Sequence, residues 1–192
     1  MENLQRINVK LYLQDPSSLS GEAAFRIFNA WIAESSEEVL VDVADYSHVG
    51  HGPTTLLIGH EANYSLDSDE GELGMLYARK QPQEGDLSNR LVGAINAALS
   101  ACRRLETAPE LEHGVSFLGN HLKITANDRL HAPNTEESAF ALRAALNPIL
   151  DKLFAGGQYA VDRDETDDER LNLRVRSESD FTTEMLLTNL AD

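Results

Sequence analysis

The chain has a single cysteine, Cys102, so it can form no intrachain disulfide, and that suits a reducing compartment. Long hydrophobic runs are also missing: the longest nearly apolar stretches have about eight residues, whereas a helix that crosses a bilayer needs about 20. Residues Met1 to Arg6 contain no apolar segment and no small-residue cleavage site, so we expect no signal peptide. These absences predict a cytoplasmic protein without a membrane partner.

Basic residues are scarce. The chain has 16 Lys and Arg against 32 Asp and Glu, which gives a formal net charge of -16. A surface this negative repels phosphate backbones and anionic lipid head groups, so we expect no nucleic-acid partner. The simplest interpretation of the charge is a solubilising surface. The alternative is a role in binding a basic protein or a multivalent cation.

Familiar catalytic motifs are absent as well. The sequence contains no Gly-x-Ser-x-Gly elbow, no Walker A loop, no dinucleotide-binding glycine motif, no Cys-x-x-Cys pair and no His-Glu-x-x-His. No motif therefore names a reaction, and whether the protein is an enzyme stays open. With 42% hydrophobic and 25% charged residues, the composition is that of a globular protein. We expect one domain over residues 1–192, with a short tail at 179–192.

Hydrophobic periodicity predicts an α+β fold, in which a mostly antiparallel or mixed sheet of about eight strands packs against three main helices. Period-two alternation or short apolar runs predict strands at 6–13, 39–44, 54–61, 71–80, 115–118, 121–125, 158–162 and 171–177. Helical spacing predicts helices at 20–34, 86–106 and 134–155. A clean alternation of strand and helix is missing, which argues against a Rossmann-type fold.

The order of these elements suggests a repeat. A helix, a short link, a strand, a turn and a second strand occupy about 86–128, and the same αββ pattern recurs over about 135–178. The 39–44 strand is expected to be buried. Cys102 falls on the apolar face of its helix, so we interpret it as an inert structural thiol. Pro148 is expected to kink or split the third helix.

That third helix has a sequence signal for its start. Asn134, with Glu137 three residues later, resembles a capping box. The chain then turns at two glycines, Gly156 and Gly157, which are expected to end the helix.

A histidine-rich loop is the densest polar cluster. Asp45, His48 and His51 have a spacing that can bring three ligands to one zinc or iron ion. His60 follows on the next predicted strand, about 20 Å from Pro53 if the chain is extended, so it joins the others only if the loop folds back. We favour a turn held by hydrogen-bonded histidines, and hence no cofactor, over a divalent metal. An acid–base or binding role without metal is the remaining alternative.

His60 and Glu61 are adjacent on the predicted strand, so they are expected to point to opposite faces and not to form a direct dyad. A buried His60 with a carboxylate partner would make a plausible general base. A core histidine whose hydrogen bonds are satisfied is the simpler interpretation.

A second cluster lies between a strand end and a helix start, at residues 127–134. Arg129 and His131 are close to the backbone N–H groups of the helix N-terminus, which favour a carboxylate or phosphate ligand. The alternative is a loop network of Asp128 and Arg129 beside a capped helix. This loop and the 45–53 loop both contain His-x-Pro after a strand, which suggests that they lie at the same end of the sheet and share a cleft.

Two acidic turns, residues 67–72 and 162–169, contain the oxygen ligands that hard cations prefer. Neither has the ligand spacing of an EF-hand. We therefore interpret both as solvated turns.

Two segments resemble a family of uncharacterised bacterial proteins of about this length. They are Gly59 to Asp67, with Gly52 and Pro53 upstream, and Ile124 to Arg129. The resemblance covers most of the chain. It implies a bacterial source and a self-contained unit, and it brings no activity, cofactor or catalytic residue with it.

The leading functional hypothesis is a non-catalytic binding or assembly protein that self-associates as a homodimer, because a sheet of this kind has open edges. The second is a small-molecule enzyme that uses the 45–61 segment, with or without a metal. The third is an acidic mimic that occupies a basic surface of another protein, a hypothesis motivated by net charge alone. The candidate ligand-binding residues are Asp45, His48, His51, His60, Glu61, Arg129 and His131.

Overall fold

The computed structural model describes residues 1–36, 38–49, 52–111, 114–164 and 169–191. The strands in these ranges are β1 (Ile7–Leu13), β2 (Leu40–Asp45), β3 (Pro53–Gly59), β4 (Ala62–Asp67), β5 (Gly74–Arg79), β6 (Phe117–Ala126), β7 (Tyr159–Arg163) and β8 (Leu171–Ser177). The α-helices are α1 (Gly21–Glu34), α2 (Leu87–Glu106), α3 (Glu136–Leu153) and α4 (Thr183–Ala191).

The strands form one open sheet in the order β2-β3-β4-β5-β1-β6-β8-β7. Each neighbouring pair is antiparallel, which confirms the α+β class. Two predictions are wrong. The described residues contain four α-helices, not three main ones. The αββ repeat is absent because α2 is followed by the single strand β6, whereas α3 is followed by the hairpin of β7 and β8.

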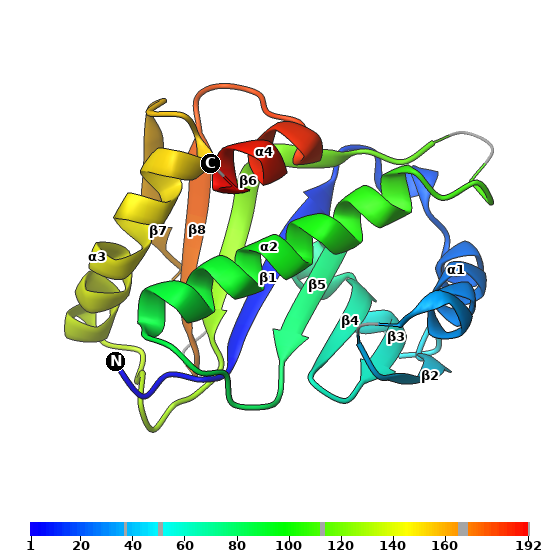
Figure 1. Cartoon of the computed structure of the whole chain (residues 1–192), viewed down its shortest axis with the longest axis horizontal. Helices are drawn as coiled ribbons and strands as arrows, with labels where there is room; N and C mark the ends of the chain where they lie inside the picture. Colours follow the sequence, from blue (N-terminus) through cyan, green and yellow to red (C-terminus); the bar gives the residue numbers. More distant parts are fainter. Residues whose placement is uncertain (37, 50–51, 112–113, 165–168, 192) are drawn as a thin grey trace.

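The four helices lie on one face of the sheet (Figure 1). Alternation along β1 explains why: Val9 and Leu11 are completely buried on the helix side, whereas Asn8 and Lys10 point to the other side. Neighbouring strands continue the apolar face with residues in register with these two, such as Leu122 of β6 opposite Leu11. Within the described ranges no helix covers the opposite face of the sheet.

Helix α2 supplies the middle of the core. Asp86 caps its start by accepting a hydrogen bond from the Asn89 backbone, and Leu91, Ile95 and Leu99 are fully buried against the sheet. Cys102 lies on the same buried stripe, as predicted. Burial raises the pKa of its thiol well above the ordinary value, and the negative charge of Glu106 adds to the effect.

The predicted hairpin at 115–125 is wrong. β6 is one continuous strand of 10 residues, and Gly119, which was expected in a turn, lies inside it. A Cβ at this position would lie 2.1 Å from the carbonyl oxygen of Phe181, just before α4. The glycine therefore allows two backbone segments to approach closely. The local sequence does not distinguish a glycine with this role from a glycine in a turn.

The segment between β3 and β5 was also predicted incorrectly. β3 ends at Gly59, two residues make the turn, and β4 begins at Ala62. An extra strand thus lies where the sequence predicted a loop and an acidic turn. Asp67 ends this strand and is 4% exposed, so it is not part of a solvated turn.

β2 was expected to be buried, but it is an edge strand of the sheet, and Val41 is 60% exposed. In α3, Pro148 neither splits nor ends the helix, which continues to Leu153. Burial of Leu146, Leu150 and Leu153 on one side stabilises the helix beyond the proline.

The cap of α3 is Thr135, one residue later than predicted. Asn134 instead accepts a hydrogen bond from Arg163 Nε through its side-chain oxygen, at 2.8 Å. Separately, none of the described helices has the length and apolar character that crossing a bilayer requires.

Candidate functional site

The histidine-rich loop begins where β2 ends. Asp45 is exposed and accepts hydrogen bonds from Ser47, which lower the pKa of the Asp45 carboxyl. His48 follows in the turn, its ring 6.4 Å from that of Tyr46. His51 lies outside the described residues, so the Asp45-His48-His51 metal site stays a prediction. Among the residues that the structure describes, no three His, Cys, Asp or Glu side chains form a group that could hold a metal ion.

His60 and Glu61 form the tight turn between β3 and β4, so the prediction that they point to opposite faces of a strand is wrong. His60 Nε2 lies 4.0 Å from Glu61 Oε1, and both side chains are largely open to solvent. Glu61 also accepts a 2.6 Å hydrogen bond from Arg79 Nη2. This pair lies at the surface and lines none of the cavities considered below.

The two predicted clusters lie at opposite ends of the sheet. β3 separates His48, before its start, from His60, after its end. The 127–134 loop follows Ala126, which pairs with Ile7 at the beginning of β1. The 45–53 loop ends at Pro53, which pairs with Asp67 at the opposite end of the sheet, where β4 ends. The prediction that the 45–53 loop and the 127–134 loop share one end of the sheet is therefore wrong. Gly52 and Pro53 of the first loop nevertheless line a cavity that adjoins, at Arg170, the cavity beside the second loop.

The 127–134 loop is built around Asp128. Its carboxylate accepts hydrogen bonds from the backbone of Leu130 and His131, and lies 2.8 Å from His131 Nδ1. Burial acts to raise the pKa of Asp128, but the hydrogen bonds from His131 and Leu130 prevail and lower it. Arg129 pairs with Glu169 at 3.3 Å. The partners differ from the predicted network of Asp128 and Arg129, because Asp128 pairs with His131 and Arg129 with Glu169. The loop lines a cavity of about 660 Å³.

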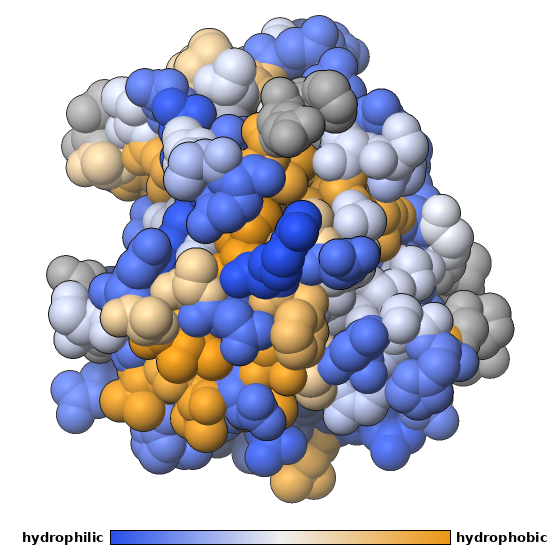
Figure 2. Space-filling view, turned by 90° about the vertical axis from the view of Figure 1, so that its right-hand side faces the viewer, coloured by the Kyte–Doolittle hydropathy of each residue, from blue (hydrophilic) through white to orange (hydrophobic). Residues whose placement is uncertain are grey.

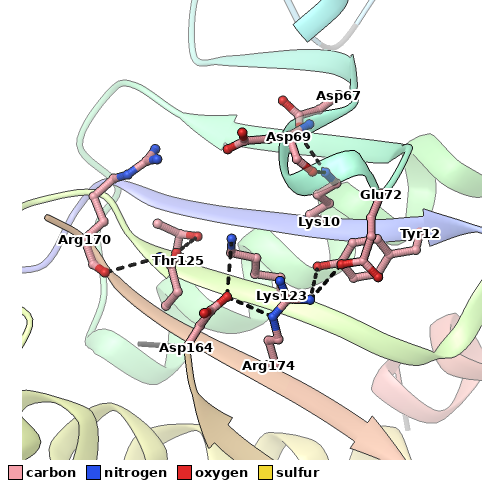
Figure 3. Close-up of polar contacts among 11 residues, drawn as sticks. Lys10, Tyr12, Asp67, Asp69, Glu72, Lys123, Thr125, Asp164, Arg170 and Arg174 are labelled. Carbon is pink, nitrogen blue, oxygen red and sulfur yellow. Dashed lines mark hydrogen bonds and ion pairs between the residues drawn. The ribbon is translucent and has the colours of Figure 1, made fainter. Parts of the chain in front are cut away.

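The uncovered face of the sheet carries a polar cluster that was not among the sites predicted from the sequence. Lys10 of β1 lies opposite Lys123 of β6, and Lys123 lies opposite Arg174 of β8, so three basic side chains form one row across three adjacent strands. Lys10 and Lys123 are 5% and 9% exposed. Figure 3 shows these side chains on the same side of the sheet, surrounded by carboxylates.

The carboxylates come from segments at the ends of other strands. Asp67 accepts a 2.6 Å hydrogen bond from Lys10, and Asp164 accepts one of 2.8 Å from Arg174 Nε. Glu72 accepts one of 2.9 Å from Arg174 Nη1. Burial acts to raise the pKa of Glu72, but the Arg174 guanidinium prevails and lowers it. Charge-assisted contacts with Asp67, Asp164 and Glu72 thus hold the basic side chains of the row in place.

An aromatic pair closes one end of this polar face. The ring of His121 stacks on that of Tyr12, with 4.3 Å between centroids. Burial lowers the pKa of His121, and the nearby Arg176 charge lowers it further. Two buried atoms on this face, Asn8 Oδ1 and His121 Nε2, find no hydrogen-bond partner among the described residues. Of these two residues, Asn8 lines the cavity described next.

A cavity of about 230 Å³ opens on the uncovered face. The polar side chains that line it include Asn8, Lys10, Asp67, Lys123, Thr125 and Asn172. Arg170 lines this cavity and also the one beside the 127–134 loop, so the two adjoin at that residue. Of the predicted site residues, Arg129 and His131 therefore lie next to the polar face.

The sequence did contain a signal for this site. Polar side chains occupy alternate positions of three strands, at Asn8 and Lys10, at His121 and Lys123, and at Asn172. One strand with a polar side is common. Three such strands predict a polar face of the sheet only if the three strands are known to be adjacent. The neighbours were not known, because strand order is not local in sequence.

No protein-family model, no curated protein and no solved structure matches this chain.

Proposed function

We propose that the protein is a non-catalytic binding protein that holds a small anionic molecule in the cavity on the uncovered sheet face. The observation that carries the proposal is the row of Lys10, Lys123 and Arg174 in direct register across three strands. Like charges directly opposite on neighbouring strands destabilise a sheet. The chain has twice as many acidic as basic residues, so three basic side chains in register on adjacent strands are unexpected by composition. Ligand binding gives a reason for their placement.

The arrangement around the row favours binding. The carboxylates of Asp67 and Asp164 hold the basic groups in place, which lowers the entropic cost of receiving a ligand. The Lys123–Asp164 ion pair, at 3.9 Å, is longer than the Lys10–Asp67 pair, at 2.6 Å. Both Lys10 and Lys123 line the cavity, so a ligand anion bound there meets these two cations of the row.

The lining and the size of the cavity narrow the ligand. Thr125, Asn172 and Asn8 provide hydroxyl and amide groups, which fix the orientation of a polar molecule. A volume of about 230 Å³ is below the range of roughly 300–1,000 Å³ that is usual for drug-sized ligands. A small polar metabolite with a negative group fits these properties better than a large apolar one.

The proposal is tested by measuring thermal stabilisation and calorimetric binding with a panel of small carboxylates and phosphate esters. Lys123→Met is the informative variant, because Asp164 keeps its contact with Arg174 and is not left unpaired. Arg26→Gln, on the exposed side of α1, is the control with the same change of charge. We expect a ligand that binds the native protein and the control but binds Lys123→Met at least about tenfold more weakly. Equal affinity in all three proteins would refute the proposal.

We also propose that the protein self-associates through β2. Val39 and Val41 are 65% and 60% exposed, and β2 is the last strand at its edge of the sheet. Figure 2 views the end of the molecule where α1 and β2 lie, and it shows apolar residues gathered toward the lower left. Two copies of one antiparallel edge strand can pair about a two-fold axis, so a second copy is the partner that fits.

Light scattering after size exclusion tests this second proposal. The native chain is expected to elute as a dimer and Val41→Lys as a monomer, because a lysine on an exposed edge strand opposes edge pairing. Thr188→Lys on α4 is the control. A monomeric native chain at all concentrations would end this proposal and leave the first one untouched.

The other two hypotheses gain no support from the geometry. The enzyme hypothesis required the histidines to converge, but His48 and His60 lie at opposite ends of β3. His131 lies just past the end of β6, and β4, β5 and β1 separate β6 from β3 in the sheet. The acidic-mimic hypothesis still depends on net charge alone.

A further inference from the structure

We infer that the ligand of the uncovered face is a zwitterion, an α-amino acid whose ammonium group binds the carboxylate of Asp69. This inference rests on the proposed function, because the acid group of the same molecule is the anion that the cavity on the uncovered face holds. That cavity, of about 230 Å³, is lined by carboxylates as well as by cations: Asp67 and Asp69 form part of its wall together with Lys10 and Lys123. A ligand that carries a negative charge alone complements only the cations.

The segment that carries Asp69 folds over the uncovered face. It is a short 3-10 helix, η2 (Asp69–Gly71), between β4 and β5, and the Asp69 carbonyl oxygen accepts a hydrogen bond from Lys10 Nζ at 3.3 Å. Figure 3 shows Asp69 on the far side of Lys10 from Lys123 and Thr125. The cavity therefore has an acidic side, next to the end of β4, and a second side on β6 that carries Lys123 and Thr125.

The backbone of Asp69 forms hydrogen bonds, whereas its carboxylate forms none. Besides the contact with Lys10, the Asp69 N–H donates a hydrogen bond to Asp67 Oδ1 at 3.2 Å. Within the described ranges of the chain, the Asp69 carboxylate makes no hydrogen bond and no ion pair. The Asp67 carboxylate, by contrast, is paired with Lys10 at 2.6 Å. A half-buried carboxylate loses part of its hydration, so a ligand cation that bonds to Asp69 contributes to affinity.

Thr125 also presents an acceptor to the cavity. Its hydroxyl donates to Asn172 Oδ1 at 2.5 Å, so the one hydrogen of this group is already used. A ligand atom that bonds to Thr125 Oγ1 must therefore be a donor. A simple dicarboxylate has no hydrogen to donate to Asp69 or to Thr125, whereas the ammonium group of an amino acid has three N–H donors.

A metal ion fits this cavity less well than an ammonium group does. Ca²⁺ takes about six to eight oxygen ligands, and Mg²⁺ requires a nearly ideal octahedron of them. In the part of the chain that the structure describes, no three His, Cys, Asp or Glu side chains form a group that could hold a metal ion. An ammonium group needs only a carboxylate and neutral acceptors for its three N–H groups.

The lining also restricts the side chain of the amino acid. Pro53 and Leu76 are the larger apolar residues among those described in the lining, and most of the others are polar or charged. The volume of about 230 Å³ is small for a ligand site. An amino acid with a short or polar side chain therefore fits this cavity better than one with an aromatic ring.

Calorimetric titration with matched pairs of ligands tests the inference. The pairs are L-alanine with propanoate, L-serine with 3-hydroxypropanoate, L-aspartate with succinate, and L-glutamate with glutarate, so the members of each pair differ by the amino group. We expect at least one of these amino acids to bind saturably, and at least about tenfold more tightly than the acid without the amino group, the gain expected for one charge-assisted contact. Absence of binding by all of these amino acids, or equal affinity within every pair, would overturn the inference.

Asp69→Asn is the informative variant, because it removes the charge and changes the size of the side chain little. It should weaken binding of the amino acid at least about tenfold and leave the affinity for the acid without the amino group unchanged or higher. Glu22→Gln, which removes one negative charge on the exposed side of α1, is the control and should bind both ligands as the native protein does. Equal weakening of both members of a pair by Asp69→Asn would show a structural role only and contradict the inference.

Failure of this inference and failure of the proposed function give different results. If Lys123→Met weakens binding of an acid while Asp69→Asn changes the affinity for no amino acid, the cavity holds an anion without an ammonium group and the inference alone fails. If Asp69→Asn weakens binding of an amino acid and Lys123→Met weakens binding of no ligand, the proposed function fails, because the row of basic side chains does not hold the acid group. Asp69 is then still the site of the ammonium group.

Discussion

Lys10 and Asp67 show how tightly single residues on the uncovered face depend on one another. Their side chains are each 6% exposed, and the Nζ–Oδ1 distance is 2.6 Å. Lys10 Nζ also lies 3.3 Å from the backbone oxygen of Asp69. Taking two charges out of water is costly, so this pair is a weak source of stability as a whole, but the loss of one partner leaves the other charge buried.

The replacement Lys10→Met is expected to lower the free energy of unfolding by about 3–5 kcal/mol, because the Asp67 carboxylate is left without its cation. Urea denaturation measures the effect. The double variant Lys10→Met with Asp67→Leu should recover most of the loss. Arg103→Gln, which breaks the exposed pair with Glu184, is the control and should cost less than about 1 kcal/mol. A single and a double variant of equal stability would contradict this account of the pair.

His121 predicts a pH dependence. Its pKa in the folded protein is lowered, first by burial and then by Arg176. As pH falls below about 6.5, the ordinary value, the unfolded chain therefore takes up the proton before the folded one does, and stability decreases until pH reaches the lowered folded pKa. Above pH 6.5 this residue contributes no slope.

Replacing His121 by Gln should reduce the loss of stability between pH 7.5 and pH 5.5, as measured by urea denaturation at both pH values. His60→Gln is the matched control, because it makes the same replacement at a side chain that is 63% exposed. If the two variants showed the same pH slope as the native protein, burial of His121 would have no role in its titration.

At the scale of elements, the sequence predicts what depends on local pattern. Helix α2 was placed within one residue by the spacing of Leu91, Ile95 and Leu99. The hairpin of β7 and β8 was found from two short alternating runs on either side of an acidic segment. These signals come from neighbours three or four residues apart in a helix, or two apart in a strand.

The errors in the predicted secondary structure arise where a contact between distant segments determines the local conformation. Gly119 and Asn120 have the composition of a turn, but the strand continues because Gly119 packs against the carbonyl of Phe181. β4 was missed since its polar residues, Asn63, Ser65 and Asp67, suggested a loop, whereas they form the polar side of a strand. Both cases required knowledge of what lies across from the residue, which periodicity cannot provide.

Gly119→Ala tests the role of that close approach. A Cβ would meet the Phe181 oxygen at 2.1 Å, so β6 or the segment before α4 must shift, and we expect a loss of about 1–3 kcal/mol in thermal or urea unfolding. Gly93→Ala in α2 is the control. Its Cβ would meet only the flexible end of Gln83, and alanine favours a helix over glycine by about 1 kcal/mol. The packing argument requires Gly119→Ala to be the less stable of the two.

At the scale of the whole molecule, the sheet brings residues that are far apart in the sequence next to one another. Lys10, Lys123 and Arg174 come from β1, β6 and β8, which are neighbours only because β1 lies in the interior of the sheet. The candidate residues chosen from sequence lay in loops, where polar residues cluster locally. Arg129 and His131 proved to line a cavity, whereas His48 and His60 lie apart at the two ends of β3.

The overall charge sets the background for this site. Net repulsion from a chain of charge -16 disfavours any anion at long range, and salt screens that repulsion over about 10 Å at 0.1 M. An anionic ligand must therefore be held by short-range contacts with Lys123 and its neighbours. We expect its affinity to depend less on salt than that of a ligand attracted by a positive surface.

The most direct test is backbone amide chemical-shift mapping of the native protein with the tightest ligand from the panel. The account predicts that the largest saturable changes fall on Asn8, Lys10, Lys123, Thr125 and Asn172, on three adjacent strands of the uncovered face. It predicts small changes on α1 and α2, behind the sheet. Changes concentrated on the helix side or on the loop around His48, with β1, β6 and β8 unaffected, would contradict the central claim.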